Sequence, residues 1–130
     1  MLKLIAILLL LGASYNTCAA IKSYNAELVS CYDGDTCTVN LIGVDKVWGY
    51  ERKIRLLGID TPEMRGAAKL AAIKARDALL YHLHNKKLRI EINENKPMDN
   101  FGRLLAVLFA DKVNINLLML ELGLAKQYVK

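Results

Sequence analysis

The stretch RKIRLLGIDTPE, residues 52–63, decides how this chain folds and where its polar groups gather. Its first half alternates charged and apolar residues as a half-buried β-strand does, and it ends on two carboxylates, Asp60 and Glu63. Strict alternation would put Arg55 and Asp60 on opposite faces of the strand. Gly58 lies between them, and a glycine there allows a bulge or bend that turns Asp60 back towards Arg55. We therefore expect the strand to aim its two acids and its arginine at one place.

Strand and helix patterns lie on both sides of this stretch. Apolar residues alternate, or recur at helical spacing, in segments separated by turn residues such as an Asp-Gly pair. The predicted strands cover residues 26–32, 36–41, 53–59, 87–94 and 104–109, and the predicted helices cover residues 67–85 and 117–123. Asn116 is expected to cap the second helix and Gly123 to end it.

This order, β-β-β-α-β-β-α, predicts an α+β, mostly β fold. Five short strands with one helix in mid-chain suit a closed five-stranded Greek-key barrel of the OB type, with two to three helices. Closing the barrel removes the exposed edges that such apolar strands would otherwise present. A flat α+β sandwich is the alternative. Residues 43–51 are expected to form a turn whose aromatic pair, Trp48 and Tyr50, either makes contacts from an exposed loop or covers the barrel end.

Residues 1–20 differ from the rest of the chain. A basic start, an unbroken apolar run and small residues at the end are together typical of a secretory signal peptide. We predict cleavage after Ala20, one domain over residues 21–130, and a secreted or periplasmic location. A membrane anchor, a buried N-terminal helix and lipid attachment at Cys18 are the alternatives. The apolar run is shorter than the about 20 residues that span a bilayer. No later segment is apolar enough to span one, so we expect no stable membrane association after cleavage.

The chain carries a formal net charge of +5, and loss of Lys3 with the leader lowers it by one. A small basic domain is compatible with a polyanionic partner such as nucleic acid, an acidic polysaccharide or a membrane surface. The charge alone identifies none of these partners, because many secreted proteins are basic.

Cysteine is too sparse for a scaffold built on disulfides. Two cysteines remain in residues 21–130, Cys31 and Cys37, at equal distances from the centre of the predicted Asp-Gly hairpin. They therefore face each other across the ladder. They either form a disulfide in an oxidising compartment or pack as two buried thiols.

Polar residues that the fold does not require gather at the ends of the predicted strands. They are Asp33, Asp35, Arg55, Asp60, Glu63 and Arg103. Carboxylates with a backbone carbonyl make an all-oxygen site for a hard cation such as Ca²⁺ or Mg²⁺, and arginines bind phosphate oxygens through paired hydrogen bonds. A cation and two arginines would offset the charge that builds up on a phosphate under attack, while a further carboxylate takes a proton from water. The set suits hydrolysis of a phosphodiester.

Four short motifs occur in order along the chain: DGDT at 33–36, RLLGIDTPE at 55–63, DNFGR at 99–103 and GLAK at 123–126. Each motif alone is weak. Together, on this strand plan and over residues 26–128, they resemble the thermonuclease, or staphylococcal nuclease-like, family. The resemblance implies an OB barrel with three helices. It also implies an enzyme that cleaves DNA and RNA with Ca²⁺, breaking the bond to the 5′ oxygen and leaving 3′-phosphates.

By match to the family's motifs, the resemblance implies a calcium site. Asp35 and Asp60 would bind the cation through their carboxylates, together with the main-chain carbonyl of Thr61. Asp33 would lie behind these ligands and support them. Ca²⁺ is therefore the expected cofactor.

The same match implies the groups that act on the substrate. Arg55 and Arg103 would hold the phosphate, and Glu63 would be the general base. Phe101 stands where the family commonly has a tyrosine, so one hydroxyl contact to the nucleotide would be lost. Tyr128 is the candidate for stacking on a base. DNA and RNA, single-stranded or frayed, are the expected partners of a monomer.

Three functions are compatible with these residues. The first is a secreted, Ca²⁺-dependent phosphodiesterase that hydrolyses DNA and RNA by metal-assisted attack of water. The second is a non-catalytic OB-type module that binds nucleic acid. The third is a basic protein that binds polyanions of the cell envelope. The complete set of acids and arginines favours the first, because a binding module has no need of Glu63.

Overall fold

The computed structural model describes residues 20–129, so the predicted signal peptide lies outside it except for Ala20. Within the described range, no helix is long and apolar enough to cross a membrane. In chain order the elements are β1 (Ile21–Cys31), β2 (Thr36–Leu41), α2 (Lys46–Gly49), β3 (Arg52–Leu56), β4 (Ile59–Asp60), the 3-10 helix η2 (Gly66–Ala68), α3 (Lys69–Leu83), β5 (Leu88–Asn93), β6 (Leu104–Ala110), β7 (Val113–Asn114), α4 (Ile115–Glu121) and β8 (Lys126–Gln127).

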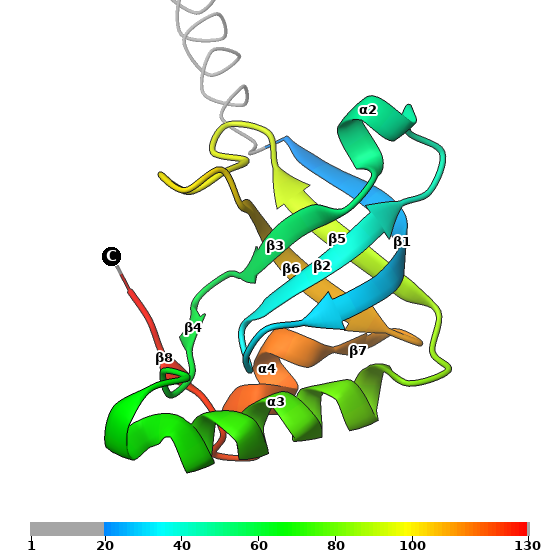
Figure 1. The fold of residues 1–130 in the computed structure, drawn as a ribbon. Coiled ribbons are helices and arrows are strands. Elements are labelled where there is room, and N and C mark those ends of the chain that lie inside the picture. The colour runs from blue at the N-terminus through cyan, green and yellow to red at the C-terminus, as the bar shows by residue number, and fades with distance from the viewer. Residues whose placement is uncertain (1–19, 130) are drawn as a thin grey trace, which may run out of the picture.

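Five of these strands close into a barrel (Figure 1). β1 pairs with β2 and β5, β2 pairs with β3, and β5 pairs with β6, all antiparallel. A parallel pairing of β3 with β6 completes the ring. With three α-helices among the described residues, this confirms the predicted α+β barrel of the OB type. The β3–β6 pairing excludes the flat sandwich, which would leave both strands as edges.

Alternation along the strands fills the barrel with aliphatic side chains. Every second residue of β5 and of β6 is buried. The largest fully buried side chains of the barrel strands include Val39, Ile54, Leu56, Ile90 and Leu108. Burying one such side chain stabilises the fold by about 1.5–3 kcal/mol. The helix α3 lies across one end of the barrel (Figure 1) and adds Ala75, Leu79 and Leu83 to the same core.

The third predicted strand, residues 53–59, ends earlier in the structure. β3 stops at Leu56, and Gly58 adopts a positive φ of 78°, a backbone conformation that glycine adopts without steric cost. The chain turns there and continues as β4, while Leu57 N–H donates to the carbonyl of Ala106 at 2.9 Å. The bend expected at Gly58 is therefore present, and it separates two strands.

The predicted turn over residues 43–51 contains a short helix, α2. Asp45 caps it, because Val47 N–H donates to the Asp45 carboxylate at 2.9 Å. Both aromatic residues of this segment are exposed, and 68% of the surface of Trp48 is accessible. Trp48 and Tyr50 are thus surface residues on and beside a short helix.

Asn116 does not cap α4, so that prediction is wrong. Asn114 takes the cap position, where its side chain accepts a hydrogen bond from the first turn of the helix. Asn116 is buried instead. Its Oδ1 accepts from Leu108 N–H at 3.0 Å, and its Nδ2 donates to the carbonyls of Leu57 and Ala106 at 2.9 and 3.1 Å. The residue therefore fastens α4 to β6 and to the turn that follows β3.

Candidate active site

Arg55 lies at the centre of a polar cluster formed where β3 turns into β4. Its Nη1 donates hydrogen bonds to the carbonyls of Leu56 and Ile59, both at 2.9 Å, so the side chain spans the turn. The same guanidinium lies 3.3 Å from Asp35 Oδ2 and 3.5 Å from Asp60 Oδ1. The turn thus brings the arginine and the acid of one strand end into contact, and adds a second acid from elsewhere in the chain.

Asp35 reaches this cluster from the turn between β1 and β2. Its carboxylate accepts a hydrogen bond from Thr61 N–H at 2.9 Å, and its carbonyl accepts one from Leu56 N–H at 2.8 Å. Gly34 makes this approach possible, because a Cβ atom there would lie 2.8 Å from both the Thr61 methyl carbon and Ala75 Cβ. Glycine at this position therefore lets the Asp-Gly-Asp turn pack against the segment that follows β4.

Asp33 lies on the other side of the same glycine. Asp35 N–H donates to Asp33 Oδ1 at 3.1 Å, which holds the two acids of the turn together. Burial, and next the neighbouring Asp35 carboxylate, raise the pKa of Asp33 to about 6. Two acids this close together favour a nearby positive charge, because it relieves their mutual repulsion.

A second arginine, Arg103, is held by Asp99 just before β6. Arg103 Nε donates to Asp99 Oδ2 at 2.6 Å, and Asp99 Oδ1 accepts from the backbone N–H groups of Phe101 and Arg103 at 2.9 and 3.0 Å. Burial opposes ionisation of Asp99, but these hydrogen bonds and the charge of Arg103 outweigh it and lower the pKa of the carboxyl. No role is assigned to Asp99 from the sequence. Its spacing of four residues from Arg103 within DNFGR could have indicated this ion pair.

Two hydrogen bonds and one ion pair connect Arg103 to Arg55. Arg103 Nη1 donates to Thr36 Oγ1 at 3.5 Å, and Thr36 Oγ1 donates to Asp35 Oδ1 at 3.1 Å. Asp35 in turn contacts Arg55. Both arginines also line one open cavity of about 280 Å³. Because carboxylates fix both guanidinium groups, the cavity offers oriented N–H donors to an anion.

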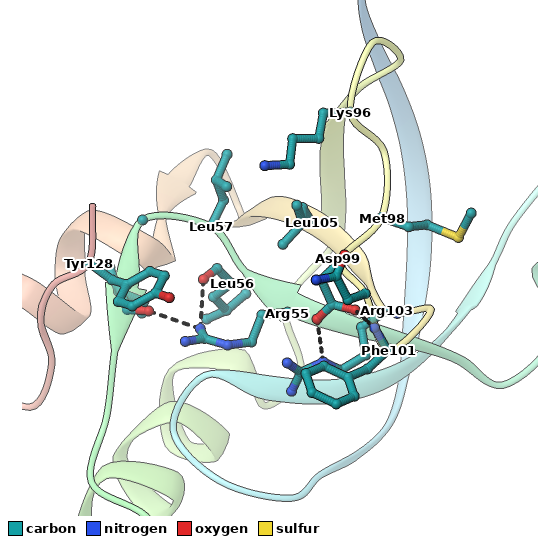
Figure 2. A pocket seen from close by; sticks show the side chains of 13 residues that line it. Arg55, Leu56, Leu57, Lys96, Met98, Asp99, Phe101, Arg103, Leu105 and Tyr128 are labelled. Atoms are coloured by element: carbon teal, nitrogen blue, oxygen red, sulfur yellow. Dashed lines mark hydrogen bonds and ion pairs between the residues drawn. The ribbon is translucent and has the colours of Figure 1, made fainter. Parts of the chain in front are cut away.

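Phe101 and Tyr128 lie at opposite sides of this cavity (Figure 2). The Phe101 ring is largely exposed, and its centre lies 5.4 Å from Arg103 Cζ. Tyr128 follows β8, which pairs with β4, and its N–H donates to the carbonyl of Gly58 at 2.9 Å. Both rings are therefore accessible to a planar ligand bound beside the arginines.

Glu63 lies apart from this cluster. Its Oε2 is 2.8 Å from Arg65 Nε, both side chains are exposed, and Glu63 does not line the cavity. The other predicted metal and phosphate residues contact one another at the turn after β3 and at the start of β6, although of these only Arg55 and Arg103 line the cavity. The full set is Asp33, Asp35, Arg55, Asp60, Thr61 and Arg103.

The oxygen atoms of the cluster fit a hard divalent cation. Asp35 and Asp60 contribute carboxylates on two sides of one guanidinium. The hydroxyl of Thr61 is the one buried side-chain polar atom of residues 20–129 without a hydrogen-bond partner. No group of three or more His, Cys, Asp or Glu side chains in that range forms a metal site by itself. A cation here would therefore complete its shell with main-chain oxygen and water, as Ca²⁺ and Mg²⁺ do.

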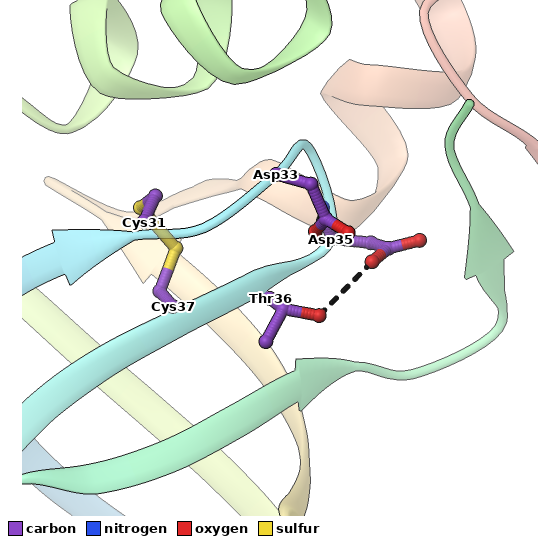
Figure 3. Close-up of a disulfide and its surroundings, with 5 residues drawn as sticks. All are labelled: Cys31, Asp33, Asp35, Thr36 and Cys37. Carbon is purple, nitrogen blue, oxygen red and sulfur yellow. Dashed lines mark hydrogen bonds between the residues drawn. A yellow bond between two sulfur atoms is a disulfide. The ribbon is translucent and has the colours of Figure 1, made fainter. Parts of the chain in front are cut away.

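A disulfide joins Cys31 to Cys37 at the base of the Asp-Gly-Asp turn (Figure 3). The two residues are direct partners in the β1–β2 register, with Cα atoms 3.9 Å apart. The loop that the bond closes contains Asp33 and Asp35. The disulfide therefore brackets the segment that supplies two of the carboxylates of the cluster.

Comparison with known proteins finds relatives along most of the chain. A protein of Haemophilus influenzae named uncharacterized endonuclease is 33% identical over 125 residues, which are 96% of this chain and 64% of the relative. The thermonuclease of Staphylococcus intermedius is 30% identical over 97 residues, which are 72% of this chain and 54% of the relative. The chain thus spans between about half and two thirds of the length of these relatives.

Comparison with models of protein families agrees with these relatives. Residues 53–130 match the family described as staphylococcal nuclease homologue. The matched range contains the turn after β3 and Arg103, whereas the Asp-Gly-Asp turn precedes it. More than half of the chain is covered by this match, and the chain belongs to the staphylococcal nuclease homologue family.

Proposed function

We propose that this protein is a nuclease that hydrolyses the phosphodiester bonds of DNA and RNA with Ca²⁺. One observation carries the proposal: Arg55 and Arg103 line one open cavity, and Asp35 and Asp60 flank Arg55. Positive groups for a phosphate and oxygen ligands for a cation thus belong to one cluster. Membership of the family, and relatives named endonuclease and thermonuclease, support the same reaction.

The two arginines bind the phosphate that is cleaved. Each is already fixed by carboxylates, so its N–H groups need little reorganisation when the phosphate enters. Their paired donors match the phosphate oxygens, and they stabilise the additional negative charge of the transition state. Phe101 and Tyr128 contact the nucleosides beside that phosphate, which favours single-stranded or frayed substrate because only an unpaired base can stack on them.

The cation site consists of the Asp35 and Asp60 carboxylates and the main-chain carbonyl of Thr61, with Asp33 supporting Asp35. A divalent cation bound there supplies positive charge to the phosphate and makes water more acidic. Arg55 contacts both carboxylates, so it also holds them near one another before the cation binds.

Glu63 takes the proton from the attacking water. Its carboxylate must first leave Arg65, and an exposed pair of this kind is worth only about 0.2–1 kcal/mol. The water oxygen bonds to phosphorus as the bond from phosphorus to the 5′ oxygen breaks. The 5′ oxygen takes a proton from solvent water and leaves as a hydroxyl, and the other product carries a 3′-phosphate.

A cleavage assay tests this proposal. Purified protein is incubated with single-stranded DNA or RNA oligonucleotides, in Ca²⁺ or in a calcium chelator. We expect cleavage only in Ca²⁺, with 3′-phosphate ends on the products. Cleavage that persists in the chelator, or intact DNA and RNA in Ca²⁺, contradicts the proposal.

The ion pair between Glu63 and Arg65 favours one alternative, a non-catalytic OB-type module that binds nucleic acid. In such a module the arginines would bind phosphate and no carboxylate would activate water. Glu63→Gln separates the two functions. The nuclease should lose about 10²–10⁴-fold in rate and keep its affinity for an oligonucleotide. The binding module should show no cleavage before or after the change.

We also propose that the protein is exported and acts as a monomer. The pattern of residues 1–20 supports export, and so does the Cys31–Cys37 disulfide, because such bonds persist in oxidising compartments. N-terminal sequencing of protein recovered from the medium or periplasm should begin at Ile21. A chain that keeps Met1 and stays in the cytosol would contradict export, and gel filtration measures the oligomeric state.

A further inference from the structure

We infer that a second groove, separate from the active-site cavity, binds the single strand of nucleic acid beyond the cleaved phosphate. The inference rests on the proposed nuclease function. The groove lies between β1, α2 and the loop after β5, and has a volume of about 390 Å³. The lining residues that carry the argument are Lys22, Tyr24, Leu41, Trp48, Arg52 and Ile92.

Trp48 and Tyr24 give the groove two aromatic side chains. Trp48 is largely exposed, and Tyr24 is half-buried with Lys22 Nζ 5.6 Å from the centre of its ring. Leu41 and Ile92 add an aliphatic floor from β2 and β5. A nucleic-acid base has two flat faces that stack on aromatic rings whatever the sequence. The lining therefore suits an unpaired base.

The backbone that carries Trp48 is fixed although the side chain is exposed. Trp48 N–H donates to the Asp45 carbonyl at 2.9 Å, and the Asp45 carboxylate caps the same helix. Gly49, the last residue of α2, packs closely against the end of β2, since a Cβ there would lie 3.2 Å from the carbonyl oxygen of Leu41. Binding on a fixed turn costs little ordering entropy, so Trp48 is a preorganised stacking platform.

Arg52 adds a positive charge at the side of the groove that faces the active-site cavity. Its Nη2 lies 3.7 Å from Met98 Sδ, and it forms no ion pair with any carboxylate of residues 20–129. Met98 lines the active-site cavity, whereas Arg52 lines the groove. Arg52 and Arg55 are three residues apart on β3, which separates their Cα atoms by about 10 Å. Alternation puts their side chains on opposite faces of β3, so a nucleic-acid strand would pass from one to the other by way of Met98, which contacts Arg52 and lines the active-site cavity.

The loop between the two hollows carries a further cation. Lys96 lines the active-site cavity, where Figure 2 shows it with Met98, and the next residue, Pro97, lines the groove. Lys96 forms no ion pair within the described part of the chain. The passage from cavity to groove is therefore positively charged.

Charge favours nucleic acid over other occupants. The one acid that lines the groove, Glu94, pairs with Lys22 at 3.8 Å, so Arg52 remains as a net positive charge beside the aromatic rings. Nucleic acid places a phosphate beside each base, which matches a cation beside each stacking surface. An anionic lipid surface would also meet Trp48 and the exposed Val47, so vesicles serve as the competing partner in the test.

Trp48 is the one tryptophan of the chain, so its fluorescence reports directly on the groove. The Glu63→Gln protein in Ca²⁺, in which cleavage is suppressed, is titrated with oligothymidylates of two and eight nucleotides. It is titrated separately with vesicles of phosphatidylglycerol and phosphatidylcholine. We expect the octamer to quench the Trp48 emission, and the dimer and the vesicles to leave it unchanged.

Variants in the same background test the residues. Trp48→Ala and Arg52→Gln should each weaken binding of a labelled octamer about tenfold, measured by fluorescence anisotropy, because each removes one stacking or phosphate contact. Trp48→Phe keeps an aromatic face and should retain most of the affinity. Tyr81→Ala is the matched control, because it removes an aromatic residue of similar exposure, 78%, from α3. Its affinity should equal that of the parent.

Each outcome decides between the groove and the nuclease function. Emission that the octamer does not change, quenching by vesicles alone, or equal octamer affinity in Trp48→Ala and its parent overturns the groove. Quenching by the octamer without any cleavage by the wild-type protein overturns the nuclease function and supports the groove. Cleavage by the wild-type protein without quenching by the octamer supports the nuclease function and overturns the groove.

Discussion

The guanidinium of Arg55 lies 3.3 Å from the carboxylate of Asp35, although the two residues come from different strand ends. Only 14% of the Arg55 side chain and 6% of the Asp35 side chain are exposed, so water screens the pair weakly. This contact joins a group proposed to bind phosphate to a group proposed to bind calcium. Whatever binds one of the two residues therefore changes the electrostatic environment of the other.

Loss of this contact should show first in stability. Arg55→Gln should lower the free energy of unfolding of the calcium-free protein by about 3 kcal/mol, because it leaves two carboxylates without their positive partner. Added Ca²⁺ should restore part of the loss, since the cation supplies the missing charge. Urea unfolding with and without Ca²⁺ measures both effects. The control Arg76→Gln breaks a more exposed ion pair on α3 and should cost less than about 1 kcal/mol. Equal losses in the two variants would contradict the prediction.

Gly34 should be needed for calcium binding as well as for packing. Gly34→Ala should destabilise the fold by about 1–3 kcal/mol and weaken Ca²⁺ binding, because the new methyl group would push Thr61 away from Asp35. Gly43→Ala is the control. Gly43 has a positive φ of 80° but open space around it, so this variant should lose about 1–2 kcal/mol of stability and keep its Ca²⁺ affinity. Calorimetric titration with Ca²⁺ distinguishes them, and equal affinities in both variants would rule out the role of Gly34.

Asp99 should make stability depend on pH. Hydrogen bonds from the Arg103 region lower its pKa in the folded protein, so its contribution is present above the pKa of the unfolded chain, about 3.9. The contribution is lost as the pH falls from there through the lower folded value. Asp99→Asn should therefore cost about 1–2 kcal/mol at pH 7. The difference between wild type and variant should shrink as the pH drops below about 4. Urea unfolding across pH 2–7 measures it, and a constant difference would refute the assignment.

The disulfide should stabilise the turn that carries Asp33 and Asp35. Replacing Cys31 and Cys37 by serine opens a short loop and should cost about 2 kcal/mol of stability. It should also weaken Ca²⁺ binding, because the two acids then lose a constraint on their backbone. A thiol reductant should have the same two effects on the wild-type protein and none on the double variant. If reduction leaves the Ca²⁺ affinity of the wild type unchanged, the turn does not depend on the bond.

The barrel can be predicted from the sequence because each strand carries its own signal. Alternation marks β5 and β6, and the Asp-Gly pair marks the hairpin of β1 and β2, which places Cys31 opposite Cys37. The bend at Gly58 is equally local, since it follows from where a glycine stands between an arginine and an acid. Structural features that depend on a few neighbouring residues can therefore be predicted from the sequence.

Contacts between distant segments cannot be read from the sequence. Asn116 looks like a helix cap because it precedes an apolar run, yet its partner Leu57 lies 59 residues away and meets it only in the closed barrel. The link from Arg103 to Thr36 likewise spans 67 residues. The hydrogen bond from Leu57 N–H to the carbonyl of Ala106 also joins segments that lie far apart in the chain. In each case the barrel closure, and not the local pattern, determines the partner.

The central claim is that Arg55 and Arg103 act on the same phosphate. Single-turnover cleavage of a single-stranded DNA oligonucleotide in Ca²⁺ tests it most directly, with Arg55→Gln, Arg103→Gln, the double variant and the control Arg76→Gln. Each single arginine variant should slow cleavage by about 10²–10³-fold. The double variant should be slower than either by less than the product of the two effects, because residues that act as a unit are not additive. Arg76→Gln should cleave as the wild type does. A folded Arg55→Gln or Arg103→Gln protein that cleaves at the wild-type rate would contradict the account.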